Sequence, residues 1–324
     1  MPPLVSVVVT TYNQAAYIGP ALDSVLAQTR APDEIVVVDD GSTDATPDAI
    51  APFRKHIVHI RQANQGVAQS RNAGIRAAHG EFLAFLDGDD LWEPDKLAVQ
   101  VRAALEHPAS GLIAVSGVQF TESRIARDTL FSPQITRLFE GGAASVSVDA
   151  FDLFLRESVI WTTSQAMIPA WTLQAVGLSD PQFQVVSDWD LYLRIAERYP
   201  VTFVNGRLVR WRYHDESVSG PGRLRQLRWG EEGIRMAARR LHAGPKPRRR
   251  AVRRALKHQI DETARAAYDR TTPGHREIGL GCLRRLLRWS HVSLAPAAFL
   301  VAAYSPDWLT RTVGRVMRGA RRAP

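Results

Sequence analysis

The sequence is poor in cysteine, with Cys282 as the only one among 324 residues. A lone cysteine cannot close an intramolecular disulfide, and no group of Cys and His residues has zinc-finger spacing. Two glycine-rich phosphate-binding signatures are also missing: G-x-x-x-x-G-K-[ST], and G-x-G-x-x-G after the first strand. These absences exclude disulfide scaffolds, zinc fingers, P-loop proteins and dinucleotide-binding proteins, and they favour a reducing compartment.

Targeting segments and long apolar runs are missing too. The N-terminus has no basic region and leads directly into the strand-like run Leu4–Val9, so we expect no signal peptide. The apolar stretch Val292–Tyr304 is too short to span a bilayer and contains Pro296. We therefore expect a cytoplasmic protein.

Negative charge is scarce in the last third of the chain. Residues 1–219 hold 17 Lys and Arg against 26 Asp and Glu, a net charge of −9, whereas residues 220–324 hold 24 against 7, a net charge of +17. We place a boundary near Gly220-Pro221-Gly222. This predicts a catalytic domain at 1–220 and a basic helical region at 221–324.

Short β-branched runs alternate with amphipathic stretches in the first half, which predicts an α/β fold with a mainly parallel open sheet flanked by helices. The predicted strands are Val5–Thr10, Glu34–Asp39, Ile57–Arg61, Phe82–Leu86 and Leu112–Val118. The predicted helices include Ala15–Ala27, Asp44–Phe53, Gly66–Ala78, Pro94–Glu106, Val148–Arg156 and Asp188–Arg198. Ligands of such sheets bind at the carboxyl ends of the strands.

The most informative of those ends is Asp87-Gly88-Asp89-Asp90. Three like charges repel one another at close range, and a divalent cation is the usual reason that they are tolerated together. A D-x-D pair alone is equally consistent with an ordinary acidic turn. Polar residues also follow the first two strands, at Thr10–Asn13 and Asp39–Ser42.

Several segments together resemble the family 2 glycosyltransferases: VSVVVTTYNQAAYIGPALDSVLAQT, EIVVVDDGSTDAT and NQGVAQSRNAGIRAAHGEFLAFLDGDDLWEPDKL. The resemblance covers the first third continuously and resumes with VSDWDLYLRIAERYP and WRYHDESVS. It implies the GT-A fold, a Rossmann-like sheet, a nucleotide-diphosphate sugar donor, Mg²⁺ or Mn²⁺, and inversion at the anomeric carbon. It divides the catalytic domain into a nucleotide-sugar half, 1–119, and an acceptor half, 120–220.

The resemblance assigns the donor base to the first two polar segments. Thr10 and Tyr12 match positions that hold and stack the base, and Asp40 matches the position that hydrogen-bonds it. An aromatic face stacks on a base, and a carboxylate accepts the imide N–H of uracil or thymine. Without the resemblance, Tyr12 reads as packing and Asp40 as helix capping.

The resemblance also assigns roles to the acidic cluster and to the predicted helix before it. Arg71 matches a donor-site position that reaches a phosphate or holds the acidic loop, although a solvated helix arginine is the alternative. Asp87 would face the ribose or the metal, and Asp89 would bind the metal. We expect Asp90 to cap or orient the turn at 91–94.

The later motifs supply the remaining assignments. Asp188 matches the catalytic base, but Ser187 stands where the family usually has Glu, which leaves the role of that Glu open. His214 is expected to complete the metal or phosphate shell, and Arg212 to pair with a carboxylate. Without the resemblance, Asp188 reads as compensation of the helix dipole and His214 as structural.

The basic tail has its own pattern. In Asp307–Arg322, apolar and cationic residues lie on opposite faces of a helix, which suits attachment to an anionic membrane or docking of the helix on its own domain. The basic runs lack a recognition motif and base-stacking aromatics, so we do not expect a nucleic acid partner.

These features predict an inverting, metal-dependent glycosyltransferase that moves a sugar from a UDP- or dTDP-sugar to a hydroxyl of a glycan or lipid-linked glycan. We expect a role in cell-surface polysaccharide synthesis, at the cytosolic face of the membrane. Two alternatives remain: a nucleotidyltransferase with a similar acidic metal site, and an inactive nucleotide-sugar-binding scaffold.

Overall fold

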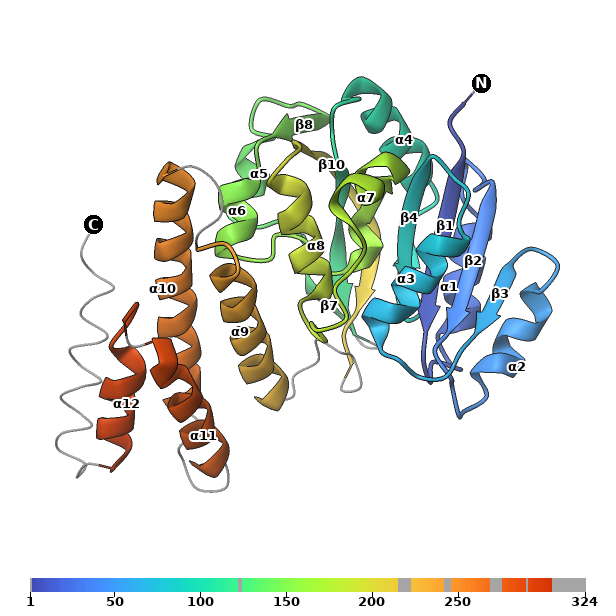
Figure 1. The fold of residues 1–324 in the computed structure, drawn as a ribbon. Helices are drawn as coiled ribbons and strands as arrows, with labels where there is room; N and C mark the ends of the chain where they lie inside the picture. Colours follow the sequence, from blue (N-terminus) through green and yellow to red (C-terminus); the bar gives the residue numbers. More distant parts are fainter. Residues whose placement is uncertain are drawn as a thin grey trace. The chain divides into compact units, whose positions relative to one another are not determined.

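The structure, a computed structural model of the chain, describes residues 2–121, 124–214, 223–241, 246–268, 276–289 and 291–304. The chain divides into two compact units, Met1–Ser217 and Val218–Pro324. All strands of the described residues lie in the first unit, and the described parts of the second unit are helical (Figure 1).

Within the described residues, ten strands form one sheet with the order β3-β2-β1-β4-β9-β6-β10-β5 along its main path. Their bounds are β1 (Val5–Thr11), β2 (Glu34–Asp39), β3 (Val58–Arg61), β4 (Phe82–Asp87), β5 (Leu91–Trp92), β6 (Leu112–Phe120), β7 (Ile125–Arg127), β8 (Ser145–Val148), β9 (Ala166–Pro169) and β10 (Val201–Arg212). Strands β3, β2, β1 and β4 are parallel, whereas β9 runs antiparallel to both β4 and β6. The sheet is therefore parallel in its N-terminal half and mixed beyond β4.

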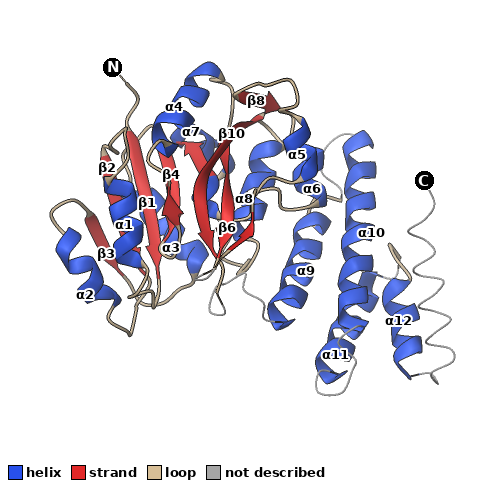
Figure 2. Ribbon diagram, turned by 180° about the vertical axis from the view of Figure 1, so that it is seen from behind, coloured by secondary structure: helices blue, strands red, loops and turns tan. Residues whose placement is uncertain are grey.

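Helices cover both faces of this sheet. They are α1 (Ile18–Leu26), α2 (Thr46–Ile50), α3 (Val67–Ala77), α4 (Lys96–Glu106), α5 (Pro133–Arg137), α6 (Phe151–Arg156), α7 (Ala170–Val176) and α8 (Ser187–Ala196). Figure 1 shows α3 in front of the sheet, and Figure 2, from behind, shows α1 in front of the other face.

Strand β1 forms because its β-branched residues are buried on both faces, as is usual for a central parallel strand. Val5, Val7 and Val9 share a core cluster with residues of α1 and α4. On the opposite face Val8 meets α3 at Gly74, where an added Cβ would lie 2.3 Å from Val8 Cγ1. Glycine thus lets α3 lie directly on the sheet, which brings Arg71 of the same helix to the end of β4.

The five strands predicted from the sequence are present, each within two residues of its predicted bounds. The predicted start of the helix at Val148–Arg156 was wrong. Val148 instead pairs with Val201 in the sheet, and α6 begins at Phe151, whose N–H donates to Asp149 Oδ1 at 3.1 Å. Pairing with a distant strand outweighed the local helical pattern.

The second unit contains α9 (Arg223–Ala238), α10 (Lys246–Tyr268), α11 (Arg276–Leu286) and α12 (Ala295–Tyr304). Its core includes Leu227, Ile234, Leu256, Ile260, Leu283 and Phe299, together with the buried Cys282. Basic side chains are exposed along α10: Arg249, Arg250, Arg253, Arg254 and Lys257.

In the described part of the chain, none of the helices combines the length and apolarity that crossing a membrane requires. The amphipathic helix predicted at Asp307–Arg322 lies outside the described residues.

Candidate functional site

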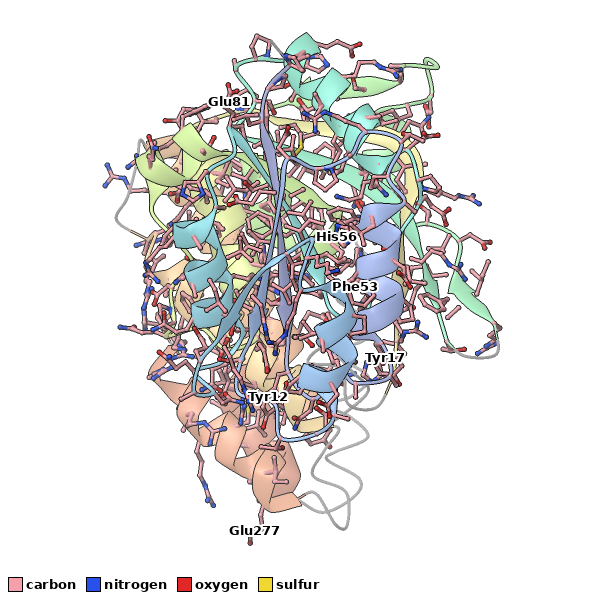
Figure 3. All side chains as sticks on the ribbon, turned by 90° about the vertical axis from the view of Figure 1, so that its right-hand side faces the viewer. Tyr12, Tyr17, Phe53, His56, Glu81 and Glu277 are labelled. Carbon is pink, nitrogen blue, oxygen red and sulfur yellow. The ribbon has the colours of Figure 1, made fainter. Side chains whose placement is uncertain are left out.

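The carboxyl ends of β1, β2 and β4 bring the three polar segments together at one edge of the sheet. In the parallel register, Thr11 pairs with Asp39 and Thr10 pairs with Asp87. Figure 3 shows Tyr12, which follows β1, at the end of the sheet away from Glu81, which precedes β4. The segments that the sequence singled out therefore share one rim.

Asp40 fixes the loop that leads into α3. Its Oδ1 accepts hydrogen bonds from Gln62 Nε2 at 2.7 Å and from the N–H of Gln65 at 3.0 Å. Its Oδ2 accepts the N–H of Gly66 at 2.8 Å. Since an ionised carboxylate offers about four lone-pair positions, Asp40 keeps capacity for one further donor.

Thr10 and Tyr12 lie at the end of β1, next to the end of β2 that leads to Asp40. The N–H of Asp40 donates to the carbonyl of Thr11 at 2.9 Å, so the backbone that leads to Tyr12 lies beside the backbone of Asp40. The Tyr12 side chain is 44% exposed, whereas Thr10 is buried, with its Oγ1 3.5 Å from Asp87 Oδ1. An open aromatic face next to a hydrogen-bond acceptor suits a planar ring that carries an N–H group.

Asp87 is held from two sides. Its Oδ1 pairs with Nη2 of Arg71 at 3.1 Å, and its Oδ2 accepts Thr162 Oγ1 at 3.1 Å. Arg71 is only 8% exposed, and its Nε has no hydrogen-bond partner among the described residues. Burial acts to lower the pKa of Arg71, but the carboxylates of Asp87 and Asp188 outweigh it and raise that pKa. A buried guanidinium is therefore held by Asp87 at the end of β4, and its Nε is left without a partner among the described residues.

Asp89 meets the segment at the end of β10. His214 Nε2 lies 3.0 Å from Asp89 Oδ2, and Arg212 Nε donates to the Asp89 carbonyl at 2.9 Å. The Arg212 guanidinium also lies over the rings of Tyr17 at 4.7 Å and Phe120 at 4.5 Å. The expected carboxylate partner of Arg212 is not found among the described residues, because the guanidinium is occupied by a carbonyl and two aromatic rings.

Asp90 was expected to cap or orient the turn at 91–94, and its side-chain hydrogen bonds lead to other segments instead of capping that turn. It is fully buried, and its Oδ2 accepts Thr162 Oγ1 at 2.7 Å and Ser164 Oγ at 2.6 Å. Its Oδ1 accepts the N–H of Arg212 at 2.9 Å. Burial, reinforced by the charges of the neighbouring Asp89 and Asp87, raises the pKa of Asp90 well above its usual value. Asp90 joins the acidic turn to β10 and to the segment before β9.

Thr162 and Ser164 are site residues that the sequence analysis missed. Ser164 lies in the short helical turn η2 (Thr163–Gln165), and Thr162 is the N-cap of that turn and forms a capping box with Gln165. A T-x-x-Q pattern is a recognised signal for such a turn. It could have predicted the turn, but its contact with the acidic cluster depends on the tertiary fold.

Asp188 lies in the first turn of α8, and its Oδ1 accepts the N–H of Trp189 at 2.7 Å. Burial raises the pKa of Asp188, and the nearby positive charge of Arg71 only partly opposes this effect. Ser187 beside it is buried. A half-buried carboxylate with a raised proton affinity is suited to accepting a proton.

The raised pKa gives a prediction for stability. Near pH 3.9, the ordinary Asp value of about 3.9, the unfolded chain loses the Asp188 proton first, while the folded chain still holds it. Folding therefore becomes less favourable as the pH rises from there through the raised pKa. We expect Asp188→Asn to melt at a higher temperature than the wild type at neutral pH.

Thermal unfolding followed from pH 3 to pH 8 measures this difference. The gain should shrink towards about pH 3, where the carboxyl is mostly protonated in both states. Asp23→Asn, at an exposed position of α1, is the matched control. A lower melting temperature of Asp188→Asn at neutral pH would show that the ionised carboxylate stabilises the fold.

The resemblance implies a divalent ion, and the donor atoms near Asp89 fit one. Among the described residues, no group of three or more His, Cys, Asp or Glu side chains could hold a metal ion by itself. Asp89 Oδ2 and His214 Nε2 lie 3.0 Å apart and would offer a divalent ion one oxygen and one nitrogen ligand. Such ions commonly take few protein ligands and complete their shell with substrate phosphates.

Comparison with known proteins gives the family. Residues 6–160 match the family described as Glycosyl transferase family 2, and the chain belongs to that family. TuaG of Bacillus subtilis, named a putative teichuronic acid biosynthesis glycosyltransferase, is 40% identical over 109 residues, which cover 32% of this chain and 43% of TuaG. The match covers 30% of the length of two further relatives, alr2836 of Nostoc and EpsH of Bacillus subtilis, and 68% of RT0329 of Rickettsia typhi.

Solved structures give the fold. S. aureus TarS 1–349 in complex with UDP-GlcNAc aligns with a TM-score of 0.71 at 17% identity, covering 98% of this chain and 92% of that one. The mannosyltransferase PcManGT from Pyrobaculum calidifontis, in complex with GDP-Man and Mn²⁺, aligns with a TM-score of 0.59 at 22% identity, covering 94% and 86%. The predicted GT-A fold, with a helical C-terminal region, is confirmed.

Proposed function

We propose that this chain transfers a sugar from a UDP- or dTDP-sugar to a hydroxyl of a glycan or lipid-linked glycan, with inversion of the anomeric carbon. The observation that carries the proposal is the meeting of Tyr12, Asp40, Asp87 and Arg71 at one sheet edge, within electrostatic reach of Asp188. TuaG, a relative, supports a place in cell-surface polysaccharide synthesis.

The first half of the site would bind the donor. Tyr12 stacks on the base, Thr10 holds it, and the remaining lone pair of Asp40 accepts the imide N–H of uracil or thymine. Asp87 faces the ribose or the metal, and Arg71 and Arg212 are placed to receive phosphate oxygens. TarS, a neighbour in fold, has been solved with UDP-GlcNAc, which supports a nucleotide-sugar donor.

Asp89 and His214, with Asp87 close by, would hold Mg²⁺ or Mn²⁺. When bound, the ion would offset the negative charge that grows on the departing diphosphate. Mn²⁺ accompanies the donor in PcManGT, which supports this assignment. Arg71 adds a fixed positive charge on the same side of the site.

Asp188 would act as the base. It takes the proton of the acceptor hydroxyl as that oxygen attacks the anomeric carbon on the face opposite the diphosphate, so that one displacement inverts the centre. Burial increases the proton affinity of Asp188, and the positive charge of Arg71 partly opposes this effect. Ser187 cannot supply the second carboxylate of the usual motif, so Asp188 performs this step alone.

Calorimetric titration with UDP, dTDP and GDP, with and without Mn²⁺, tests the donor assignment. We expect UDP or dTDP to bind more tightly than GDP, because guanine does not present the same imide edge to Asp40. Mn²⁺ should strengthen that binding. Absence of nucleotide binding in all six titrations would refute the proposal.

We also propose that the region 221–324 attaches the protein to an anionic membrane surface at the cytosolic face. The exposed arginines of α10 support this, since each basic residue near such a surface contributes about 1 kcal/mol. Cosedimentation with phosphatidylglycerol vesicles is expected, and cosedimentation with phosphatidylcholine vesicles is not. Equal behaviour with both lipids would contradict an electrostatic attachment.

A further inference from the structure

An exposed tryptophan lies at the rim of the acidic turn. Trp161 is 39% exposed, although most large aromatic side chains of this unit are buried. The next residue, Thr162, donates to both Asp87 and Asp90. The indole is therefore one residue away from a side chain that touches the proposed donor and metal site.

The backbone beneath this indole is rigid. The N–H of Trp161 donates to Gln165 Oε1 at 2.8 Å, and Gln165 Nε2 donates to the carbonyl of Val115 in β6 at 2.8 Å. Because Gln165 is fully buried, it ties Trp161 to the centre of the sheet. The Trp161 ring packs at 6.0 Å against Trp211, which is itself buried. An exposed ring on a fixed support loses little freedom when a ligand covers it.

Positive charge lies on the same side of Trp161. The guanidinium carbon of Arg127 is 4.5 Å from the centre of the Trp161 ring. Arg127 and Arg137 also line a hollow of about 480 Å³, whose walls include Phe131, Pro133 and Asp128. The lining of this hollow contains the two guanidinium groups and the single carboxylate of Asp128, and Glu140 lines the adjoining hollow that shares Phe131 with it.

We infer that Trp161, Arg127 and this hollow bind the acceptor, and that the acceptor is a glycan bearing carboxylate or phosphate groups. The C–H face of a sugar ring packs on an aromatic face, and guanidinium groups recognise carboxylate and phosphate in a bidentate manner. The inference rests on the proposed transferase function, since it assigns the second substrate of that site.

The test uses the full chain and three soluble probes of equal length: tetragalacturonic acid, a glycerol phosphate tetramer and neutral cellotetraose. Calorimetry measures each probe in the presence of UDP and Mn²⁺, and UDP binding is measured separately for every variant. We expect at least one anionic tetramer to bind at least about tenfold more tightly than cellotetraose. Comparison of the two anionic probes tells carboxylate from phosphate recognition.

Single substitutions test whether the anionic tetramer binds at Trp161 and Arg127. We expect Trp161→Ala and Arg127→Gln each to weaken binding of the anionic tetramer by about tenfold or more, while the affinity for UDP stays unchanged. Trp161→Phe keeps a ring that can stack and should retain most of the affinity. Trp171→Ala is the matched control, because Trp171 is 41% exposed on α7 and packs against Tyr199.

Each contrary result rules out one specific claim. Equal binding of neutral and anionic tetramers overturns the charge assignment, and equal effects of Trp161→Ala and Trp171→Ala overturn the stacking assignment. If UDP binds but no tetramer does, this inference fails and the proposed donor chemistry stands. If an anionic tetramer binds at Trp161 but no nucleotide binds, the proposed transferase function fails and the glycan site stands.

Discussion

Replacing Asp188 by asparagine is expected to slow sugar transfer by about 10²- to 10⁴-fold, the usual contribution of a general base. Asparagine has nearly the same shape, and its amide oxygen can still accept the N–H of Trp189. It cannot take a proton from the acceptor hydroxyl. The affinity for the donor should stay within about twofold of the wild-type value, because the proposed contacts with the nucleotide base and the phosphates lie elsewhere, at Tyr12, Asp40 and Arg71.

Initial rates over a range of acceptor concentrations measure this effect, with calorimetry of UDP as the binding control. Asp190→Asn is a matched variant from the same helical turn, where Asp190 pairs with Arg194 at 2.9 Å. It should lose stability but keep most of its kcat. Turnover of Asp188→Asn close to that of the wild type would remove Asp188 from the role of base.

Replacing Asp89 by alanine is expected to weaken UDP binding in Mn²⁺ by about tenfold or more and to remove the difference between titrations with and without the metal. Asp89 Oδ2 and His214 Nε2 form the only His–carboxylate pair of the described residues at this rim. Removing the carboxylate leaves only the His214 imidazole and the nearby Asp87, which are too few protein ligands to retain the ion next to the diphosphate.

Paired titrations of UDP with and without Mn²⁺ check this expectation. Asp95→Ala is the control, because Asp95 follows the same acidic turn but is exposed and accepts Thr29 Oγ1 at 2.8 Å. The control should respond to Mn²⁺ as the wild type does. Identical metal dependence in Asp89→Ala and the wild type would exclude Asp89 as a ligand.

The central strands could be predicted because local pattern and tertiary role agree there. β1, β2 and β4 are runs of β-branched and apolar residues buried on both faces, and helix signals separate them. Once they are parallel, the register alone brings Thr10 opposite Asp87 and Thr11 opposite Asp39. Family resemblance then supplied the roles, which composition and spacing alone left open.

Contacts between residues that are far apart in the sequence could not be predicted from the local pattern. Asp90 was expected to cap or orient its own turn, and its hydrogen-bond partners lie 72 to 122 residues away, in Thr162, Ser164 and Arg212. Strand β9 has four residues and joins β4 and β6 in antiparallel pairing, which no local period indicates. The segment that carries Trp161 therefore gave no sign of its position beside the acidic turn.

Release of nucleoside diphosphate from a panel of UDP-, dTDP- and GDP-sugars in Mn²⁺ tests the central claim most directly. The wild type should slowly hydrolyse one UDP- or dTDP-sugar even without an acceptor, because water can take the place of the acceptor hydroxyl. Asp188→Asn should bind that donor and leave it intact. The account would be contradicted if the protein hydrolysed none of the nucleotide sugars and instead released pyrophosphate from a nucleoside triphosphate and a sugar phosphate. That result would indicate a nucleotidyltransferase.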